Sequence, residues 1–195
     1  MNKTFAPLAC ALALLAAVPA AKADVLSFDD LSGLQFFTAD YRGFRFGSNN
    51  IDDTPWFHTD QANLPAGPKS GNTYLATDFR LFGGHAFEAA QAITSAQAFG
   101  FDGAWFSGQE AVRYQLFRNG KLVFTSANSA ALGPVPQFVA SGYTGLVDSV
   151  VVLGTQGFYG LDDFTFTPAV PEPQSAWMLA AGLLGLGAWA RRRRA

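Results

Sequence analysis

The sequence predicts an all-β fold, a single β-sandwich of the jelly-roll type. About ten short runs rich in Phe, Val and Tyr lie between residues 24 and 168, separated by Gly and Pro. Several runs alternate apolar and polar residues, which is the period of a half-buried strand. No long segment has the 3.6-residue period of an amphipathic helix. Short strands at this spacing are typical of sandwiches.

Two of the expected strands show this alternation clearly. In the third of them, Phe44 and Phe46 fall on one face and Arg45 on the other; in the last, Phe164 and Phe166 share a face. The ranges are 25–28, 34–38, 41–46, 56–59, 73–77, 96–101, 105–106, 111–117, 122–126, 137–141, 146–153 and 158–167.

The clearest local signal is a hairpin. Residues 118–121 read Arg-Asn-Gly-Lys between the strands at 111–117 and 122–126. Asn and Gly both tolerate positive φ, which the two-residue turns of hairpins require. Elsewhere, residues 86–96 are the best helical candidate, and residues 47–72, rich in Asn, Asp, Pro and Gly, predict a long loop.

The N-terminus has the three parts of a secretory signal peptide, which forms a short helix. Lys3 supplies the positive charge, residues 8–18 the apolar run, and Ala21 and Ala23 the small residues of a cleavage site. We expect cleavage after Ala23, so that the signal peptide is 1–23.

The C-terminus, residues 169–195, has three parts as well. It starts with the triplet Pro171, Glu172 and Pro173, which proline holds extended. An uncharged run at 177–190 predicts a hydrophobic helix of about 14 residues, roughly 21 Å long. A hydrocarbon core is about 30 Å thick, so this transmembrane helix is short for a permanent anchor. The chain then ends in a basic cluster, which the positive-inside rule keeps in the cytoplasm: Arg191, Arg192, Arg193 and Arg194.

These three parts, in this order at the end of the chain, resemble the PEP-CTERM sorting signal of Gram-negative bacteria. The resemblance covers about an eighth of the chain. It implies handling by exosortase, a membrane-embedded cysteine protease or transpeptidase-like enzyme usually encoded beside exopolysaccharide machinery. It further implies export across the inner membrane, transient anchoring there through the C-terminal helix, and delivery to the cell surface or extracellular matrix. The alternative is an ordinary tail anchor with a fortuitous Pro-Glu-Pro.

The domain between these two ends, residues 24–168, is acidic. Without Lys3, Lys22, Glu172 and the four tail arginines, 14 acidic and 7 basic residues remain, whereas the whole chain has a formal charge of −2. No basic patch is visible, so the sequence predicts no nucleic-acid partner. Cys10, the only cysteine, lies in the signal peptide, so the mature protein has no disulfide. Acidic oxygens in an exported protein favour calcium as a bound ion.

A second resemblance covers most of this domain. The segments FDDL (28–31), YRGFRF (41–46), AFGFDGAWF (98–106) and YGLDDFTF (159–166) look like the jelly-roll domains common in PEP-CTERM proteins. Those domains are similar in outline to galactose-binding-like and carbohydrate-binding modules. The resemblance implies a structural calcium that ties the end of the first strand to the last strand.

The positions that match such a calcium site are carboxylates at the two ends of the domain. Paired carboxylates are costly unless water, arginine or a cation balances them. The alternative is that they are solvated residues of strand edges and turns. The candidate ligands are Asp29 or Asp30 and Asp162 or Asp163.

The sequence predicts no enzyme. Glu88, Asp102 and Glu110 could supply the carboxyl pair of a glycosidase, but no spacing or motif favours them. His58 and His85 lie far apart and lack a metal-ligand spacing. A nucleophile elbow and a phosphate-binding glycine loop are also missing from the sequence.

Three aromatic residues could stack on sugar rings. Trp56 lies beside a Pro-rich loop and is the preferred carbohydrate-stacking candidate. Trp105 stands between Phe101 and Phe106, which favours a place in the core. Tyr143 is the third candidate.

The expected function is that of an exported, non-enzymatic surface or extracellular-matrix protein that exosortase sorts and that binds exopolysaccharide. Its expected partners are exosortase, the inner membrane transiently, and exopolysaccharide. Two other classes remain open: a secreted glycan-active enzyme, and a purely structural surface protein with no small ligand.

Overall fold

The computed structural model describes residues 22–37, 40–48, 56–61, 64–78, 89–154 and 158–169. Four residues of the C-terminal segment are also described, all with helical backbone: Gly182, Leu183, Leu186 and Arg192. The chain divides into two units, Lys22–Ala169 and Met1–Ala21 with Val170–Ala195. The first unit is the folded domain. The apolar run of the expected signal helix, residues 8–18, lies outside the described residues. Of the C-terminal helix expected at 177–190, only Gly182, Leu183 and Leu186 are described.

The described part of the domain is all-β and its strands pair antiparallel, which confirms the predicted all-β class. The strands are β1 (Asp24–Leu26), β2 (Gln35–Phe36), β3 (Asp40–Tyr41), β4 (Phe44–Ser48), β5 (Phe57–Thr59), β6 (Tyr74–Asp78), β7 (Ala89–Gly108), β8 (Val112–Arg118), β9 (Lys121–Thr125), β10 (Gln137–Ala140), β11 (Leu146–Gly154) and β12 (Phe158–Pro168).

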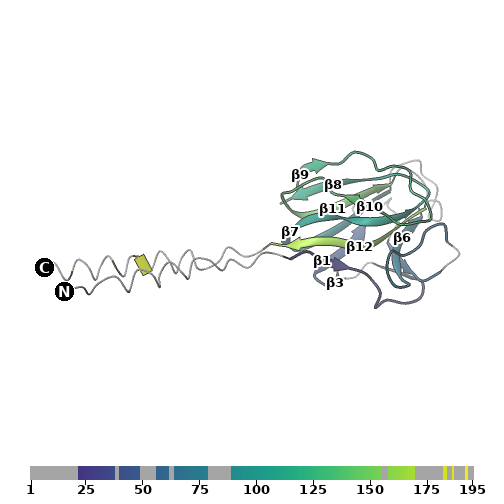
Figure 1. Ribbon diagram of the computed structural model, residues 1–195, viewed down its shortest axis with the longest axis horizontal. Coiled ribbons are helices and arrows are strands. Elements are labelled where there is room, and N and C mark those ends of the chain that lie inside the picture. The colour runs from purple at the N-terminus through teal and green to yellow at the C-terminus, as the bar shows by residue number, and fades with distance from the viewer. Residues whose placement is uncertain are drawn as a thin grey trace, which may run out of the picture. The chain divides into compact units, whose positions relative to one another are not determined.

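The long strand β7 joins the two halves of the sheet (Figure 1). Its first half pairs with β4 on one side and β11 on the other. Its second half pairs with β12 and β10. One half of the sheet therefore has the order β3-β4-β7-β11-β8-β9, and the other has β2-β5-β6-β12-β7-β10.

Aromatic contacts join the two halves face to face. Phe44 of β4 meets Phe166 and Phe164 of β12, with ring centroids 4.7 and 5.5 Å apart. Phe101 of β7 stacks on Phe164 at 4.8 Å and meets Tyr114 of β8 edge-on at 4.9 Å. All five side chains are buried in one core, so the halves form the two layers of a sandwich.

A bulge in β12 sets which side chains face this core. The register with β7 shifts between Asp162 and Thr165, and Asp163 has a φ of 45°. Asp tolerates this left-handed conformation better than most residues do. The extra residue explains the unequal spacing of the core residues on β12, which are Tyr159, Leu161, Phe164 and Phe166. Asp162 consequently points to the outer face of its sheet.

The predicted hairpin is confirmed. Arg118 and Lys121 pair across it, and Asn119 and Gly120 have φ values of 51° and 72°. The turn is also held by the Asp148 carboxylate, which accepts from Arg118 Nη1 at 2.9 Å and from the Asn119 N–H at 2.6 Å. The local sequence and the tertiary contacts thus favour the same turn.

Two strand predictions are corrected by local geometry. The expected strand at 41–46 is two strands, because Arg42 and Gly43 have φ values of 48° and 86° and form the turn between β3 and β4. The expected strands at 96–101 and 105–106 are parts of the single strand β7. Neither the turn nor the continuity of β7 follows from alternation alone.

The helical candidate at 86–96 is wrong where the structure describes it. From Ala89 onward the chain is extended, because β4 and β11 bond to this part of β7 on its two sides. Sheet pairing overrides the weak helical preference of an Ala-rich segment. Residues 86–88 lie outside the described residues. The expected long loop at 47–72 contains the end of β4 and the short strand β5.

Replacing Gly108 by alanine is expected to lower the free energy of unfolding by about 2 kcal/mol. Gly108 has a φ of +149°, and an added Cβ would press on the Phe158 carbonyl and lie 2.8 Å from Tyr159 Cα. Urea unfolding measures the loss. The control is Gly133→Ala, where an added Cβ meets nothing within 4 Å. Equal stabilities of the two variants would contradict the prediction.

Candidate functional site

The outer face of β10, β7 and β12 carries a row of three cross-strand neighbours. Phe138 pairs with Trp105, and Trp105 pairs with Asp162. The flanking Ala104 and Phe106 of β7 are fully buried in the core, so Trp105 points to the opposite face. Trp105 is half-buried, and Phe138 is 44% exposed. Their ring centroids lie 5.7 Å apart at an angle of 59°.

A short segment between β5 and β6 lies over this row. We call residues 67–71 the strap. At its start, the Gly67 N–H donates to Ser107 Oγ at 3.0 Å, and that hydroxyl donates back to the Gly67 carbonyl at 2.7 Å. Further along, Lys69 places its Nζ atom over the Trp105 ring, 4.4 Å from the centroid. We call Phe138 and Trp105 the aromatic row, and the strap partly covers its Trp105 ring.

The Asp162 carboxylate holds the middle of the strap. Its Oδ2 atom accepts from the Lys69 N–H at 2.7 Å and from the Ser70 N–H at 2.9 Å. Its Oδ1 atom accepts from the Asp163 N–H at 2.8 Å. The Ser70 hydroxyl also donates to Asp163 at 2.9 Å and lies 3.4 Å from an Asp29 carboxylate oxygen. The strap is therefore held by hydrogen bonds to side-chain oxygens rather than by pairing with a strand.

Asp162 is only 2% exposed, and this burial changes its pKa. Burial raises the pKa of Asp162 to about 7, against the lowering effect of the three backbone N–H donors, while the charge of Asp163 adds to the rise. Desolvation of the charged form is the larger effect. The strap covers a carboxyl group that titrates near neutral pH.

The four predicted calcium ligands are only partly brought together. Asp29, Asp162 and Asp163 all reach the strap, and the first and last meet at the Ser70 hydroxyl. Asp30 turns away and accepts from Tyr41 and Arg42, and the Tyr41 hydrogen bond chiefly lowers the pKa of Asp30. In the described part of the chain, no three His, Cys, Asp or Glu side chains stand close enough to hold a metal ion. Because hydrogen bonds occupy the oxygens of Asp162, these residues do not form a ready cation cage, and calcium stays a prediction.

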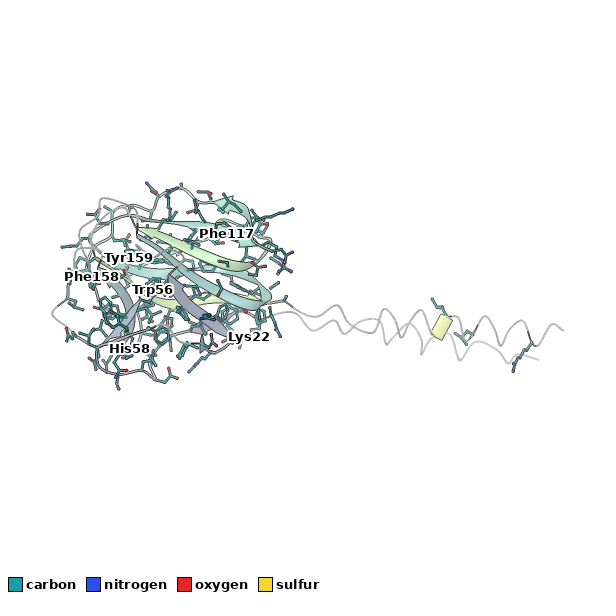
Figure 2. All side chains as sticks on the ribbon, turned by 180° about the vertical axis from the view of Figure 1, so that it is seen from behind. Lys22, Trp56, His58, Phe117, Phe158 and Tyr159 are labelled. Atoms are coloured by element: carbon teal, nitrogen blue, oxygen red, sulfur yellow. The ribbon has the colours of Figure 1, made fainter. Side chains whose placement is uncertain are left out.

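Two aromatic assignments from the sequence are wrong. Trp56, the preferred sugar-stacking candidate, is fully buried and packs edge-on against Tyr159 at 6.0 Å (Figure 2). It has no free ring face to offer a sugar. Trp105, expected in the core, lies on the outer face because its neighbours Ala104 and Phe106 occupy the inner one.

The third aromatic candidate, Tyr143, is half-buried. It stacks on Phe124, with ring centroids 5.4 Å apart and an angle of 25° between the planes. One of its faces is therefore already covered.

The described residues weighed for catalysis or for metal binding have other contacts. Asp102 accepts from the Thr167 hydroxyl at 3.1 Å. His58 is 6% exposed and meets the Phe37 ring edge-on at 5.9 Å. Glu110 accepts from the Leu132 N–H through its backbone carbonyl at 3.3 Å. Glu88 and His85 lie outside the described residues.

The predicted sorting and cleavage residues also lie mostly outside the described part of the chain. Ala23 is exposed immediately before β1, and Arg192 is an exposed helical residue. Ala21, Pro171, Glu172, Pro173, Arg191, Arg193 and Arg194 are not described. Among the described residues, no helix has the length and apolar character needed to span a membrane.

Residues 169–194 match the PEP-CTERM protein-sorting motif, which confirms the sorting signal predicted from the tail. This motif implies export, processing by exosortase and sorting to the cell surface. No curated protein matches the chain.

Among the solved structures that are similar to the chain at low identity are the following three. The K2 cleaved adhesin domain of Lys-gingipain is 13% identical, with a TM-score of 0.47 over 75% of this chain and 99% of that one. The family 32 CBM from C. perfringens NanJ, solved in complex with galactose, is 14% identical, with a TM-score of 0.38 over 64% and 90%. The enzymatically active domain of bacteriophage CBA120 tailspike protein 4 is 11% identical, with a TM-score of 0.36 over 65% of this chain and 19% of that one. None of these likenesses transfers a ligand or an activity to this chain.

Proposed function

We propose that this protein is a non-enzymatic surface or extracellular-matrix protein that associates with exopolysaccharide after sorting by exosortase. The observation that carries the proposal is the direct succession of domain and signal. The last strand, β12, ends at Pro168, and the sorting motif begins at residue 169. The sandwich directly precedes the motif along the chain, which supports the sandwich as the part that the signal delivers.

The surface of the sandwich supports association with a glycan more than with a nucleic acid. The domain has twice as many acidic as basic residues, which opposes binding to a polyphosphate. It also presents aromatic side chains beside polar groups on the outer face, where Phe138 is 44% exposed. Aromatic faces and hydrogen-bonding groups together suit the C–H and hydroxyl groups of a sugar.

The sorting part of the proposal is tested by deleting Arg191–Arg194 and following the protein by immunoblot of cell fractions. The expected result is a full-size precursor that stays in the membrane fraction, whereas the wild-type protein is shortened and released to the surface or matrix. The control is Leu122→Ala, which changes an exposed side chain of the domain and should be sorted normally. Unchanged size and location of the deletion protein would contradict the proposal.

The glycan part is tested separately by incubating the protein with exopolysaccharide from the producing cells. Retention of the protein without release of sugar supports the proposal. Neither retention nor release would leave a structural surface protein. Release of reducing sugar would point to a glycan-active enzyme instead.

A further inference from the structure

Phe138 and Trp105 lie side by side on the outer face of the sheet rather than in the core. Phe138 lies against Gly103 of β7, where an added Cβ would stand 2.8 Å from Phe138 Cζ and would press on the Val139 carbonyl. Gly103 also has a φ of +144°, which favours glycine. A glycine at this position lets the Phe138 ring lie close to the sheet beside Trp105.

The Lys69 ammonium covers one face of the Trp105 ring and can move away from it. Lys69 is exposed, its Nζ stands 4.4 Å from the ring centroid, and a cation–π contact at an exposed site gains only about 0.5–1 kcal/mol. The Lys69 side chain is long and rotatable, so it can swing off the ring while the backbone of the strap stays bonded to Asp162. The Lys69 side chain can therefore uncover the Trp105 ring while the backbone of the strap stays in place.

We propose that Trp105, Phe138 and Lys69 form a binding site for a neutral polysaccharide, in which a sugar ring replaces the Lys69 ammonium on the Trp105 face. This inference rests on the proposed function, because it assigns the surface through which the sandwich contacts exopolysaccharide.

A neutral polymer fits the charges around the site better than an acidic one. Lys69 is the cation at the ring, but Asp29 and Asp163 lie at the next residue of the strap, Ser70. The domain as a whole has 14 acidic and 7 basic residues. A uronic-acid polymer would meet repulsion that one lysine does not offset.

A sugar also fits the site better than a protein does. The row consists of two neighbouring rings beside one charged group, whereas a stable protein interface buries about 800 Å² on each partner. Sugar rings need only an aromatic face and nearby hydrogen-bonding groups, which this row and the strap supply together.

Affinity electrophoresis and calorimetry of the full chain test the site with galactan, mannan and β-glucan as neutral probes and polygalacturonate as the acidic probe. We expect the wild-type protein to bind at least one neutral probe. Trp105→Ala should weaken that binding at least about tenfold, as loss of a central aromatic contact does, and Phe138→Ala should weaken it less. Lys69→Ala should tighten it about two- to fivefold, because the ring is then uncovered.

The matched control is Leu122→Ala, which removes another exposed apolar side chain, 52% exposed on β9, and should bind like the wild type. Thermal unfolding shows which variants are folded. Trp105→Phe, which keeps a smaller ring, should bind with an affinity between those of the wild type and Trp105→Ala.

If the wild type binds a neutral probe and folded Trp105→Ala or Trp105→Phe binds it equally well, the site is overturned while the proposed function stands. Tighter binding of polygalacturonate than of every neutral probe overturns the choice of ligand. If the wild type binds no probe and no exopolysaccharide, the site and the glycan part of the proposed function fail together.

Discussion

Replacing Phe164 by alanine is expected to lower the free energy of unfolding by about 3–5 kcal/mol. The Phe164 side chain is fully buried at the centre of the sandwich. Its ring lies 4.8 Å from that of Phe101, 5.5 Å from Phe44 and 6.2 Å from Phe99. Alanine would remove these contacts and leave a cavity between the two layers, which the surrounding β-sheets can close only in part.

Urea or guanidinium unfolding of the purified protein measures this loss. The control is Phe138→Ala, which removes the same ring from a position that is 44% exposed. We expect this control to lose less than about 1 kcal/mol, since the side chain leaves no closed cavity. Similar losses for the two variants would show that Phe164 does not occupy the core.

Raising the pH from 5 to 8 is expected to lower the free energy of unfolding by about 3 kcal/mol through Asp162. The pKa of Asp162 is about 7 in the folded protein, against an ordinary value of 3.8. Between these values the folded state holds a proton that the unfolded state releases. The stabilising effect is therefore complete below about pH 4 and is lost as the pH rises through about 7. Desolvation of the carboxylate beneath the strap is the physical cause.

Denaturant unfolding at pH 5, 6, 7 and 8 tests this effect. Asp162→Asn, which cannot ionise, should show a much flatter dependence between pH 5 and 8 than the wild type. Asp148→Asn is the control, because it removes a carboxylate at the hairpin and should keep the wild-type slope. A wild-type stability that stays constant or rises from pH 5 to 8 would contradict the raised pKa.

Several features of this molecule are predictable from the sequence because they depend on local chemistry. The turn at Asn119 and Gly120 requires two residues that accept positive φ, and Asn-Gly supplies them. The sorting motif is recognisable because its triplet, apolar run and basic cluster adjoin one another at residues 169–194. The all-β fold follows from short alternating runs without helical periodicity.

The sequence did not predict which individual side chains form the candidate site. The sequence favoured Trp56 as exposed and Trp105 as buried, whereas Trp56 is fully buried and Trp105 lies half-buried on the outer face. A signal for the bulge was present in β12, where Tyr159, Leu161, Phe164 and Phe166 break the two-residue alternation by one position. Because one extra residue moves every later side chain to the other face, alternation alone could not assign Asp162.

The sequence by itself determined the class of fold, the hairpin and the sorting signal, because each is encoded within a few consecutive residues. Only the tertiary structure decided which aromatic rings face outward and what covers them. The strap at 67–71 reaches Ser107 and Asp162, residues at least 36 positions away along the chain. Such neighbours are selected by strand register and by the burial of the opposite faces, and these depend on the whole sheet rather than on any one segment.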